Sequence, residues 1–490
     1  MSTDNIVDEL KKHNYTNFKS IIRELLQTAC SDCSQEVMQI IDDYDKKNLN
    51  ILNTECPDAD VCIALGTHND LIEKHFDNFQ NFDHAIKFEK IGSDSANGFV
   101  ILIGYEKDGY KANTILKSSQ KKIFDNLYYE YLVGEFLNKQ SKYFSCFVKT
   151  YGVFKYENES TYTSIKNCNN ASNCNIQVLK SGLSIISDAY TDIDKNLKES
   201  CKSPTDMAIL IQSLKGAKSM EEKLQEDDFV KNDLILTLFQ IYMPLSCLAD
   251  KFTHYDLHLN NVLLYEPKEN SFIEYHYHMG PNDKNQDEIV TFKSSYISKI
   301  IDYGTSYFNN IEKNLHSDLI HDKVCEFNEC TYNGDNCGKS QGYISLDKLY
   351  DSVANKISSQ KNKSYDLLLL NNIYIILEEK FKIINNKQTS NLNVNERKIF
   401  NESKSKFSIV ELLLVRVYES DPFGEIGKEQ ESKDDNKIRN VIDACEKLKF
   451  FINSYYKKYN DENYQTKIKI GDLHIYSDCK TQIKFIPVGK

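Results

Sequence analysis

A cluster of polar residues stands in the middle of the chain, in the stretch FTHYDLHLNNVLLYE, residues 252–266. Asp256 precedes Asn261 by five positions, and an apolar run begins at Val262. In phosphoryl transfer a carboxylate orients the attacking hydroxyl and accepts its proton. Mg²⁺ prefers oxygen ligands from carboxylates, amides, waters and phosphates. An aspartate and an asparagine at this spacing on one loop therefore predict a site that acts on a metal-bound phosphate.

A second motif follows in SKIIDYGTSYF, residues 298–308, where Asp302 comes directly after a strand-like run. An isolated Asp-Tyr-Gly is usually an ordinary turn, but the pair of loops is more specific. Together they resemble the eukaryotic-like protein kinase superfamily, whose H-R-D-L-x-x-x-N loop is written H-Y-D-L-H-L-N-N here and whose D-F-G is written Asp302-Tyr303-Gly304. The resemblance implies ATP and Mg as cofactors, Asp256, Asn261 and, upstream, Lys117 as catalytic residues, and Asn261 and Asp302 as metal ligands.

The resemblance implies further residues upstream. A lysine at the end of an apolar strand should hold the α- and β-phosphates, and NTILKSS supplies Lys117, with Lys111 as the fallback. Lysines at strand ends are more often simply solvated. A glutamate on the following helix should pair with the lysine, and Glu130 fits the helical spacing better than Glu135.

A glycine-rich loop should cover the phosphates, because glycine lets backbone N–H groups approach them closely. IGSDSANGFV offers Gly92, Gly98 and Val100, with Ser93 and Ser95 as further donors. The middle glycine of G-x-G-x-x-G is missing, so a plain hairpin turn is the alternative interpretation.

Two further positions follow from the resemblance. The segment that reads adenine should come after LSII, near Ser187 to Ala189, which makes Asp188 a nucleotide-binding residue. Asp366, before an apolar helix, should brace the backbone of the catalytic loop, although a helix N-cap is an alternative role.

The family pattern is also broken. Tyr255 replaces the arginine of the catalytic loop, which predicts activity that does not depend on phosphorylation of the activation loop. His258 is typical of haspin-like and small-molecule kinases, and no A-P-E motif follows Asp302. We expect a serine/threonine protein kinase acting on an unidentified protein substrate. The alternatives are a small-molecule kinase of aminoglycoside or choline type and a non-catalytic pseudokinase scaffold.

These residues need a particular arrangement of elements to meet. Strand-like runs flank a helical pattern at 121–140, and helical patterns dominate after about residue 192. The predicted fold class is α+β, a two-lobed protein-kinase-like fold with a small β-rich N-lobe carrying one helix and a larger helical C-lobe. The expected domains are an N-terminal helical extension at 1–84, the N-lobe at 85–191 and the C-lobe with insertions at 192–490.

Composition limits the partners. The chain has 490 residues and a formal net charge of −12, which argues against broad nucleic-acid binding. We find no signal peptide and no apolar run long enough for a bilayer, so we expect a soluble intracellular protein without membrane contact. Many residues have A/T-rich codons, and residues 470–490 resemble the ends of kinase-like proteins of large DNA viruses. A viral origin would place the protein in the host cytoplasm or the virion.

Cysteine and histidine offer two further metal hypotheses. In an intracellular protein the 14 cysteines should be reduced thiols. Cys30 and Cys33, with Cys56 and Cys62, have a spacing that suits zinc, although buried thiols are the favoured interpretation. His276 and His278 should alternate onto one face of a hairpin strand between the two motifs, where a solvated strand is favoured over a metal site.

Overall fold

The computed structural model describes residues 45–92, 98–120, 126–168, 174–281, 286–326, 360–387, 393–418 and 437–489. The fold is mixed α+β, with 48% of the described residues in helices and 26% in strands, and its N-terminal sheet is curled and antiparallel. The mixed class agrees with the sequence-based prediction. Residues 1–44 of the expected N-terminal helical extension lie outside the described residues, and residues 45–55 are helical.

The N-terminal sheet has six antiparallel strands in the order β1-β2-β3-β6-β4-β5. They are β1 (Ala85–Ile91), β2 (Gly98–Lys107), β3 (Tyr110–Ser119), β4 (Thr150–Tyr156), β5 (Leu183–Ile185) and β6 (Met207–Gln212). Asp108 and Gly109 join β2 to β3 with positive φ angles of 52° and 80°. This two-residue Asp-Gly turn matches the twist of a hairpin and fixes the register of β3.

The position of β6 corrects the predicted N-lobe boundary at residue 191. This strand lies between β3 and β4, so the sheet runs on to Gln212. The N-terminal region is also no separate extension where it is described. The Tyr110 hydroxyl donates to the Cys56 carbonyl at 2.6 Å, and Asn113 Nδ2 donates to Asp60 at 2.7 Å. Residues 45–84 therefore share one hydrophobic core with the sheet.

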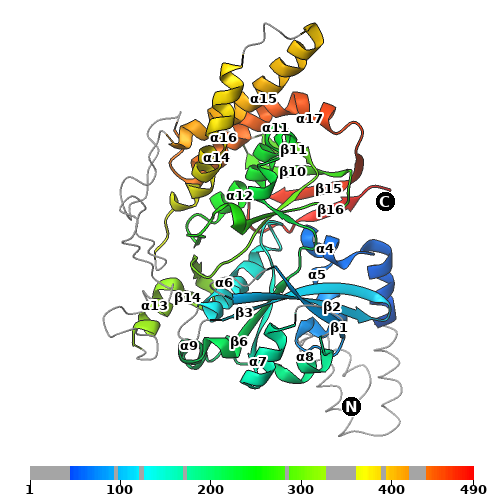
Figure 1. Ribbon diagram of the computed structural model, residues 1–490, viewed down its shortest axis with the longest axis vertical. Helices are drawn as coiled ribbons and strands as arrows, with labels where there is room; N and C mark the ends of the chain where they lie inside the picture. Colours follow the sequence, from blue (N-terminus) through cyan, green and yellow to red (C-terminus); the bar gives the residue numbers. More distant parts are fainter. Residues whose placement is uncertain are drawn as a thin grey trace.

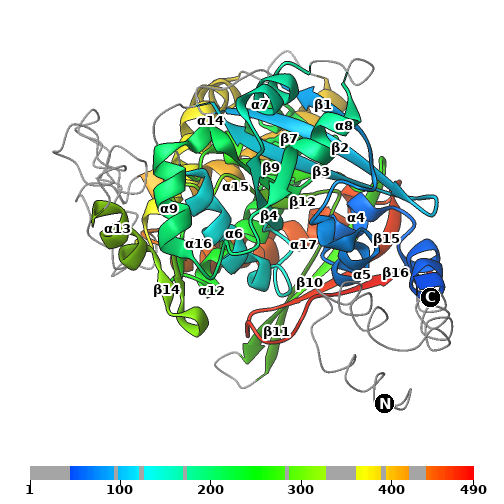
Figure 2. The ribbon, with the colours of Figure 1, turned by 90° about the horizontal axis from the view of Figure 1, so that it is seen from below.

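Helices cover this sheet on both sides (Figure 1, Figure 2). They are α4 (Ala59–Leu65), α5 (Asn69–His75), α6 (Leu127–Gln140), α7 (Glu159–Lys166), α8 (Ile176–Gly182) and α9 (Ile193–Lys202). Nearly every side chain of α6 is buried, including Glu130, which is 4% exposed. A carboxylate this deep requires a partner, because burying an unpaired charge is costly.

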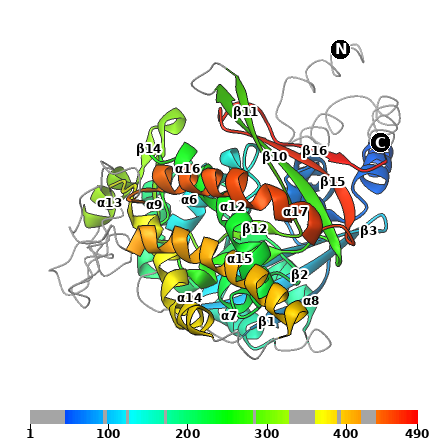
Figure 3. The same cartoon turned by 90° about the horizontal axis from the view of Figure 1, so that it is seen from above.

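The second half of the molecule is mainly helical (Figure 1, Figure 3). Its helices are α10 (Met220–Lys223), α11 (Asp227–Asn232), α12 (Leu234–Cys247), α13 (Ser317–Glu326), α14 (Leu368–Asn386), α15 (Val394–Tyr418), α16 (Val441–Phe451) and α17 (Lys457–Asn463). All side chains of α12 from Leu234 to Leu245 are buried, so α12 is the central helix of this half.

Two three-stranded sheets frame the loops that carry the sequence motifs. One contains β7 (Lys218–Ser219), β9 (Val262–Tyr265) and β12 (Ile297–Ile300), and the other contains β8 (Phe252–Thr253), β13 (Tyr307–Asn310) and β14 (Leu315–His316). The loop at 254–261 thus leaves β8 and enters β9, and Asp302 follows β12.

A four-stranded sheet lies at the edge of the helical half (Figure 3). Its order is β11 (Asp287–Ser294), β10 (Ser271–Pro281), β15 (Ile468–Tyr476) and β16 (Lys484–Pro487). The antiparallel β10–β11 pair confirms the predicted hairpin between the two motifs. The pairing of β15 in parallel with β10 joins segments almost 200 positions apart.

The cysteine prediction is wrong for two pairs. Cys56 is disulfide-bonded to Cys62, and Cys168 is disulfide-bonded to Cys174. Each pair is six residues apart, and the local turn brings the two Cα atoms to 6.0 Å and 5.5 Å. Cys56 and Cys62 are therefore not free thiolates for zinc, and Cys30 and Cys33 lie outside the described residues.

Candidate active site

Strand pairing brings the two sequence motifs together. β9 and β12 are antiparallel, with Val262 opposite Ile300, so Asn261 just before β9 meets the segment just after β12. The Ile301 N–H donates to the Asn261 carbonyl at 3.1 Å. The register of this strand pair therefore brings together the loops that carry Asn261 and Asp302, the two predicted metal ligands.

Asn261 also closes the loop onto Asp256. Its Nδ2 donates to the Asp256 carbonyl at 2.8 Å and lies 3.4 Å from the Asp256 carboxylate. Asn261 is 5% exposed, whereas the Asp256 side chain is 33% exposed. The hydrogen bonds of Asn261 thus fix the loop backbone, and the loop presents the Asp256 carboxylate at the surface of the site.

Asp366 holds the backbone of the loop at 254–261. Its buried carboxylate accepts hydrogen bonds from the backbone N–H groups of His254 at 2.8 Å and Tyr255 at 3.0 Å. Tyr255 has a φ of +62°, a left-handed conformation that is strained for a residue with a side chain. The Asp366 carboxylate therefore stabilises a backbone bend immediately before Asp256. Asp366 lies inside the short helix η9 (Tyr365–Leu367) and is not its N-cap, and the Tyr365 N–H at the start of this helix donates to the Asn362 side chain at 3.1 Å.

His254 is a structural part of the loop. Burial lowers its pKa to about 4, so the imidazole is neutral near pH 7. Its Nε2 donates to the Ile301 carbonyl at 3.0 Å, and its Nδ1 accepts from the Asp256 N–H at 3.2 Å. The ring therefore ties the first motif to the second.

Lys117 connects the N-terminal sheet to both motifs. Its Nζ lies 2.7 Å from Glu130 Oε2 on α6 and 2.9 Å from Asp302 Oδ1. Glu130 thus has the partner that its burial requires. The rejected alternatives lie elsewhere: Lys111 is exposed beside Glu106, and Glu135 accepts a hydrogen bond from Asn138, its pKa raised to about 7 by burial.

The positive charge of Lys117 and the negative charges of Glu130 and Asp302 stabilise one another. Burial opposes the charged form of Lys117, but Asp302 and Glu130 outweigh it and raise the pKa of the ammonium. The Lys117 ammonium in turn lowers the pKa of the Asp302 carboxyl. Asp302 has a φ of +67°, and its side chain is 43% exposed, so an ionised oxygen donor faces solvent at this position.

The coupling predicts a pH dependence of stability. The depressed pKa of Asp302 stabilises the folded state above the ordinary aspartate pKa of about 3.9, and this contribution is lost as the pH falls through the folded-state pKa. In Lys117→Met the main cause of the lowering is gone and burial alone raises the pKa. We therefore expect the acid-induced loss of stability that Asp302 causes in the wild type to be absent from Lys117→Met, so that the stability gap between the two proteins narrows as the pH falls.

Urea unfolding from about pH 7 down to about pH 3 measures this effect. Lys111→Met is the matched control, because it makes the same change on the same strand at an exposed residue. Equal pH profiles for Lys117→Met and the wild type would contradict the coupling.

Of the predicted glycine-rich loop, the structure describes Gly92 and Gly98, at the ends of β1 and β2. Gly92 follows β1 with a φ of +68°, and Gly98 begins β2, where a Cβ would lie 2.1 Å from the Ser118 carbonyl oxygen. Val100 is directly opposite Lys117 in the β2–β3 register. Ser93 and Ser95 lie outside the described residues.

Asp188, the residue predicted to bind the nucleotide, follows a strand that is not a neighbour of β3, the strand that carries Lys117. The strand before it, β5, is at the edge of the sheet, and the strand beside β3 is β6. The Asp188 carboxylate pairs with Lys195 at 3.0 Å at the start of α9. The chain that passes from the sheet to the helical half next to Lys117 is therefore the segment after Gln212. The apolar run MAILIQ between Pro204 and Gly216 was the signal for this strand.

Sequence reasoning also missed Asn126 and the role of Tyr303. Asn126 Nδ2, at the start of α6, donates to the Gly304 carbonyl at 2.8 Å. A Cβ on Gly304 would lie 2.5 Å from that nitrogen, so this contact requires glycine. The Tyr303 hydroxyl donates to the Ile300 carbonyl and accepts from the Val148 N–H. These hydrogen bonds of Asn126 and Tyr303 fix the turn that contains Asp302.

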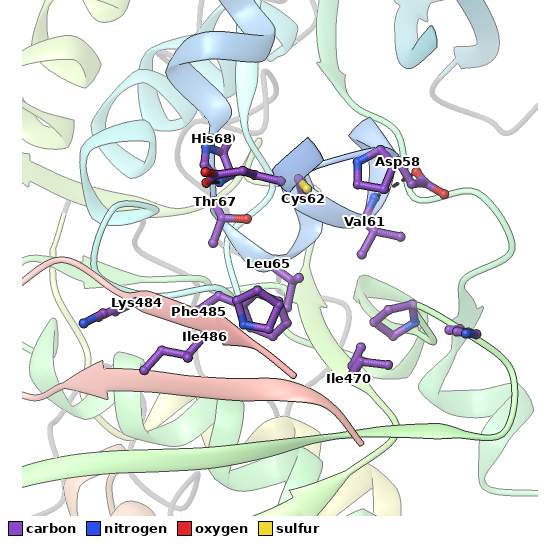
Figure 4. Close-up of a pocket in the computed structure, with 15 residues that line it drawn as sticks. Asp58, Val61, Cys62, Leu65, Thr67, His68, Ile470, Lys484, Phe485 and Ile486 are labelled. Atoms are coloured by element: carbon purple, nitrogen blue, oxygen red, sulfur yellow. Dashed lines mark hydrogen bonds and ion pairs between the residues drawn. The ribbon is translucent and has the colours of Figure 1, made fainter. Parts of the chain in front are cut away.

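Figure 4 shows a pocket that lies away from this site. It opens between α4 and the strands β15 and β16, and its lining includes Leu65, Ile470 and Phe485. None of the residues predicted to bind ATP or Mg²⁺ or to act in phosphate transfer lines it. The candidate site is therefore defined by its side-chain contacts rather than by this pocket.

Comparison with protein-family models found no match, and a search of curated proteins found none either. Within the described residues, no helix is long and apolar enough to cross a membrane.

Proposed function

We propose that the chain is an ATP-dependent phosphotransferase with a two-lobed protein-kinase-like fold, and that its acceptor is a serine or threonine hydroxyl of a protein. The observation that carries this proposal is the double contact of Lys117 with Glu130 and Asp302. It links a strand of the N-terminal sheet to the loop that follows the Asp256–Asn261 motif, and such a link is needed if one nucleotide is to be held by both halves.

The donor set fits a magnesium–nucleotide complex. Asn261 offers an amide oxygen and Asp302 an ionised, partly exposed carboxylate, which are ligand types that Mg²⁺ accepts. Bound Mg·ATP supplies the γ-phosphoryl group and the charge that neutralises its oxygens. Lys117 is the group that would hold the phosphates.

Asp256 is the residue assigned to the acceptor. Its carboxylate orients the hydroxyl and accepts its proton, and the hydrogen bonds from Asn261 and the brace at Asp366 fix its position. Fixed positioning of this kind contributes much of the rate in phosphoryl transfer, where the protein does little covalent chemistry.

A small-molecule acceptor is the second candidate, and His258 favours it. The His258 Nε2 lies 3.8 Å from Asp256 Oδ2, and its side chain is 40% exposed. Unlike a lysine, a histidine brings no permanent positive charge to the acceptor side of the site.

The test is phosphate transfer from labelled Mg·ATP, with a protein mixture in one reaction and aminoglycosides or choline in another. We expect label on phosphoserine or phosphothreonine from the wild type, none from Asp302→Asn, and wild-type transfer from the surface control Asp318→Asn. Label on the small molecule alone would contradict a protein acceptor and support the second candidate, a small-molecule kinase. Equal transfer by Asp302→Asn and the wild type would contradict both.

A further inference from the structure

The outer face of the β10–β15 pair carries a cluster of histidines and carboxylates that the proposed function does not use. Parallel pairing places Glu274 opposite Asp472 and His276 opposite His474. The alternate residues Tyr275, Tyr277, Leu473 and Ile475 are buried in the core on the other face. The strand period of two therefore gathers the polar side chains of two distant segments on one face.

We propose that Glu274, His276 and Asp472 form a binding site for a divalent transition-metal ion of the zinc class. One ligand atom from each residue lies within 4.8 Å of the other two. Ligands about 2.0–2.2 Å from a tetrahedral zinc are roughly 3.4 Å apart, so small side-chain rotations bring this set to a metal. One imidazole nitrogen and two carboxylate oxygens suit zinc better than calcium or magnesium, which prefer oxygen alone.

The residues around the three ligands support the same site. Thr291 Oγ1 on β11 lies 3.5 Å from His276 Nδ1, where it can accept the ring proton while Nε2 faces the carboxylates. His474 stacks on His276 with ring centroids 4.6 Å apart, and His278 Nε2 lies 3.0 Å from His474 Nδ1. Such partners fix the orientation of a metal-binding imidazole.

Lys469 shows that the two carboxylates already share a cation. Its ammonium lies 2.6 Å from Glu274 Oε2 and 2.8 Å from Asp472 Oδ1, and His276 Nε2 lies 2.8 Å from the same Asp472 oxygen. The lysine therefore competes with a metal ion for these oxygens. A bound ion would displace the ammonium, which is 32% exposed and free to turn toward solvent.

The competition makes the proposal testable with Zn²⁺ alone. We expect the full chain to bind zinc in competition with a chromophoric chelator. Asp472→Asn and His276→Gln should each weaken binding by at least about tenfold, since even supporting groups of metal sites cost about that much. Lys469→Met should strengthen binding, because it removes the competing charge. His316→Gln, which alters a surface histidine beside Asp318, is the matched control and should bind as the wild type does.

A second measurement guards against misfolded variants and against zinc held by thiols. Zinc should raise the thermal midpoint of the wild type and of Lys469→Met by joining β10 to β15, and should leave that of Asp472→Asn unchanged. Equal zinc affinity in the wild type and Asp472→Asn would overturn the proposal, because the metal would then be bound elsewhere. Absence of zinc binding in both the wild type and Lys469→Met would also overturn it.

Discussion

Asp256→Asn should lower the rate of phosphate transfer by about 10²–10⁴-fold, the range typical of a positioned general base. The amide has nearly the same shape as the carboxylate and leaves the hydrogen bond from Asn261 to the backbone carbonyl of residue 256 in place. It cannot accept the proton of the acceptor hydroxyl. The loss should therefore appear in kcat, with nucleotide affinity unchanged, because no nucleotide contact is assigned to Asp256.

The control for this variant is Asp250→Asn, six residues earlier. The Asp250 side chain is 68% exposed, and in the described structure its carboxylate lies 2.6 Å from the Lys361 ammonium and 3.0 Å from the Lys363 ammonium. We expect this variant to keep wild-type transfer. Single-turnover measurements with saturating Mg·ATP separate the chemical step from product release. Full activity in Asp256→Asn would remove Asp256 from the proposed mechanism.

The contacts that the sequence predicted correctly depend on short-range patterns. Lys117 ends an apolar strand run, and Glu130 occupies the helical position that faces the sheet, so side-chain periodicity alone orients both groups. Asn261 and Asp302 each flank a strand-like run, and antiparallel pairing of those runs brings them together. In these cases the local pattern determines which face or which end a residue occupies.

The sequence did not show which strands distant in the chain pair with one another. LSII before Asp188 and MAILIQ before Ser213 are both short apolar runs, and only the pairing of β6 with β3 distinguishes them. That choice depends on packing against the rest of the sheet, which propensity does not contain. The cluster of Glu274, His276 and Asp472 was missed for the same reason. Its strands, β10 and β15, are far apart in the sequence and meet only through parallel pairing.

The disulfide between Cys56 and Cys62 was missed for a different physical reason. The Asp58 side chain accepts hydrogen bonds from the N–H groups of Asp60 and Val61 and starts α4 at Ala59. The helix turn then carries Cys62 back toward Cys56. The thiols were predicted to be reduced because the protein was expected to be intracellular.

Asp366→Ala should have the largest effect on stability of the variants considered. Two backbone N–H groups, those of His254 and Tyr255, would lose their acceptor within a buried region. Each unpaired buried donor costs about 1–3 kcal/mol, so the free energy of unfolding should fall by roughly 2–6 kcal/mol. Asp366→Asn should fall between Asp366→Ala and the wild type, because its single amide oxygen can accept from one donor while its NH₂ group faces the other.

The loss of this brace should also reach the active site. The strained bend at Tyr255 persists because the Asp366 carboxylate holds it, and Asp256 is the next residue. Once the bend relaxes, a displacement of about 1 Å at Asp256 is enough to lower transfer by about 10²-fold. Urea unfolding and single-turnover transfer, measured on Asp366→Asn at a temperature where it remains folded, test both effects. Wild-type stability together with wild-type transfer would mean that Asp366 is only a polar residue at the start of a helix and that the catalytic loop holds its shape without it.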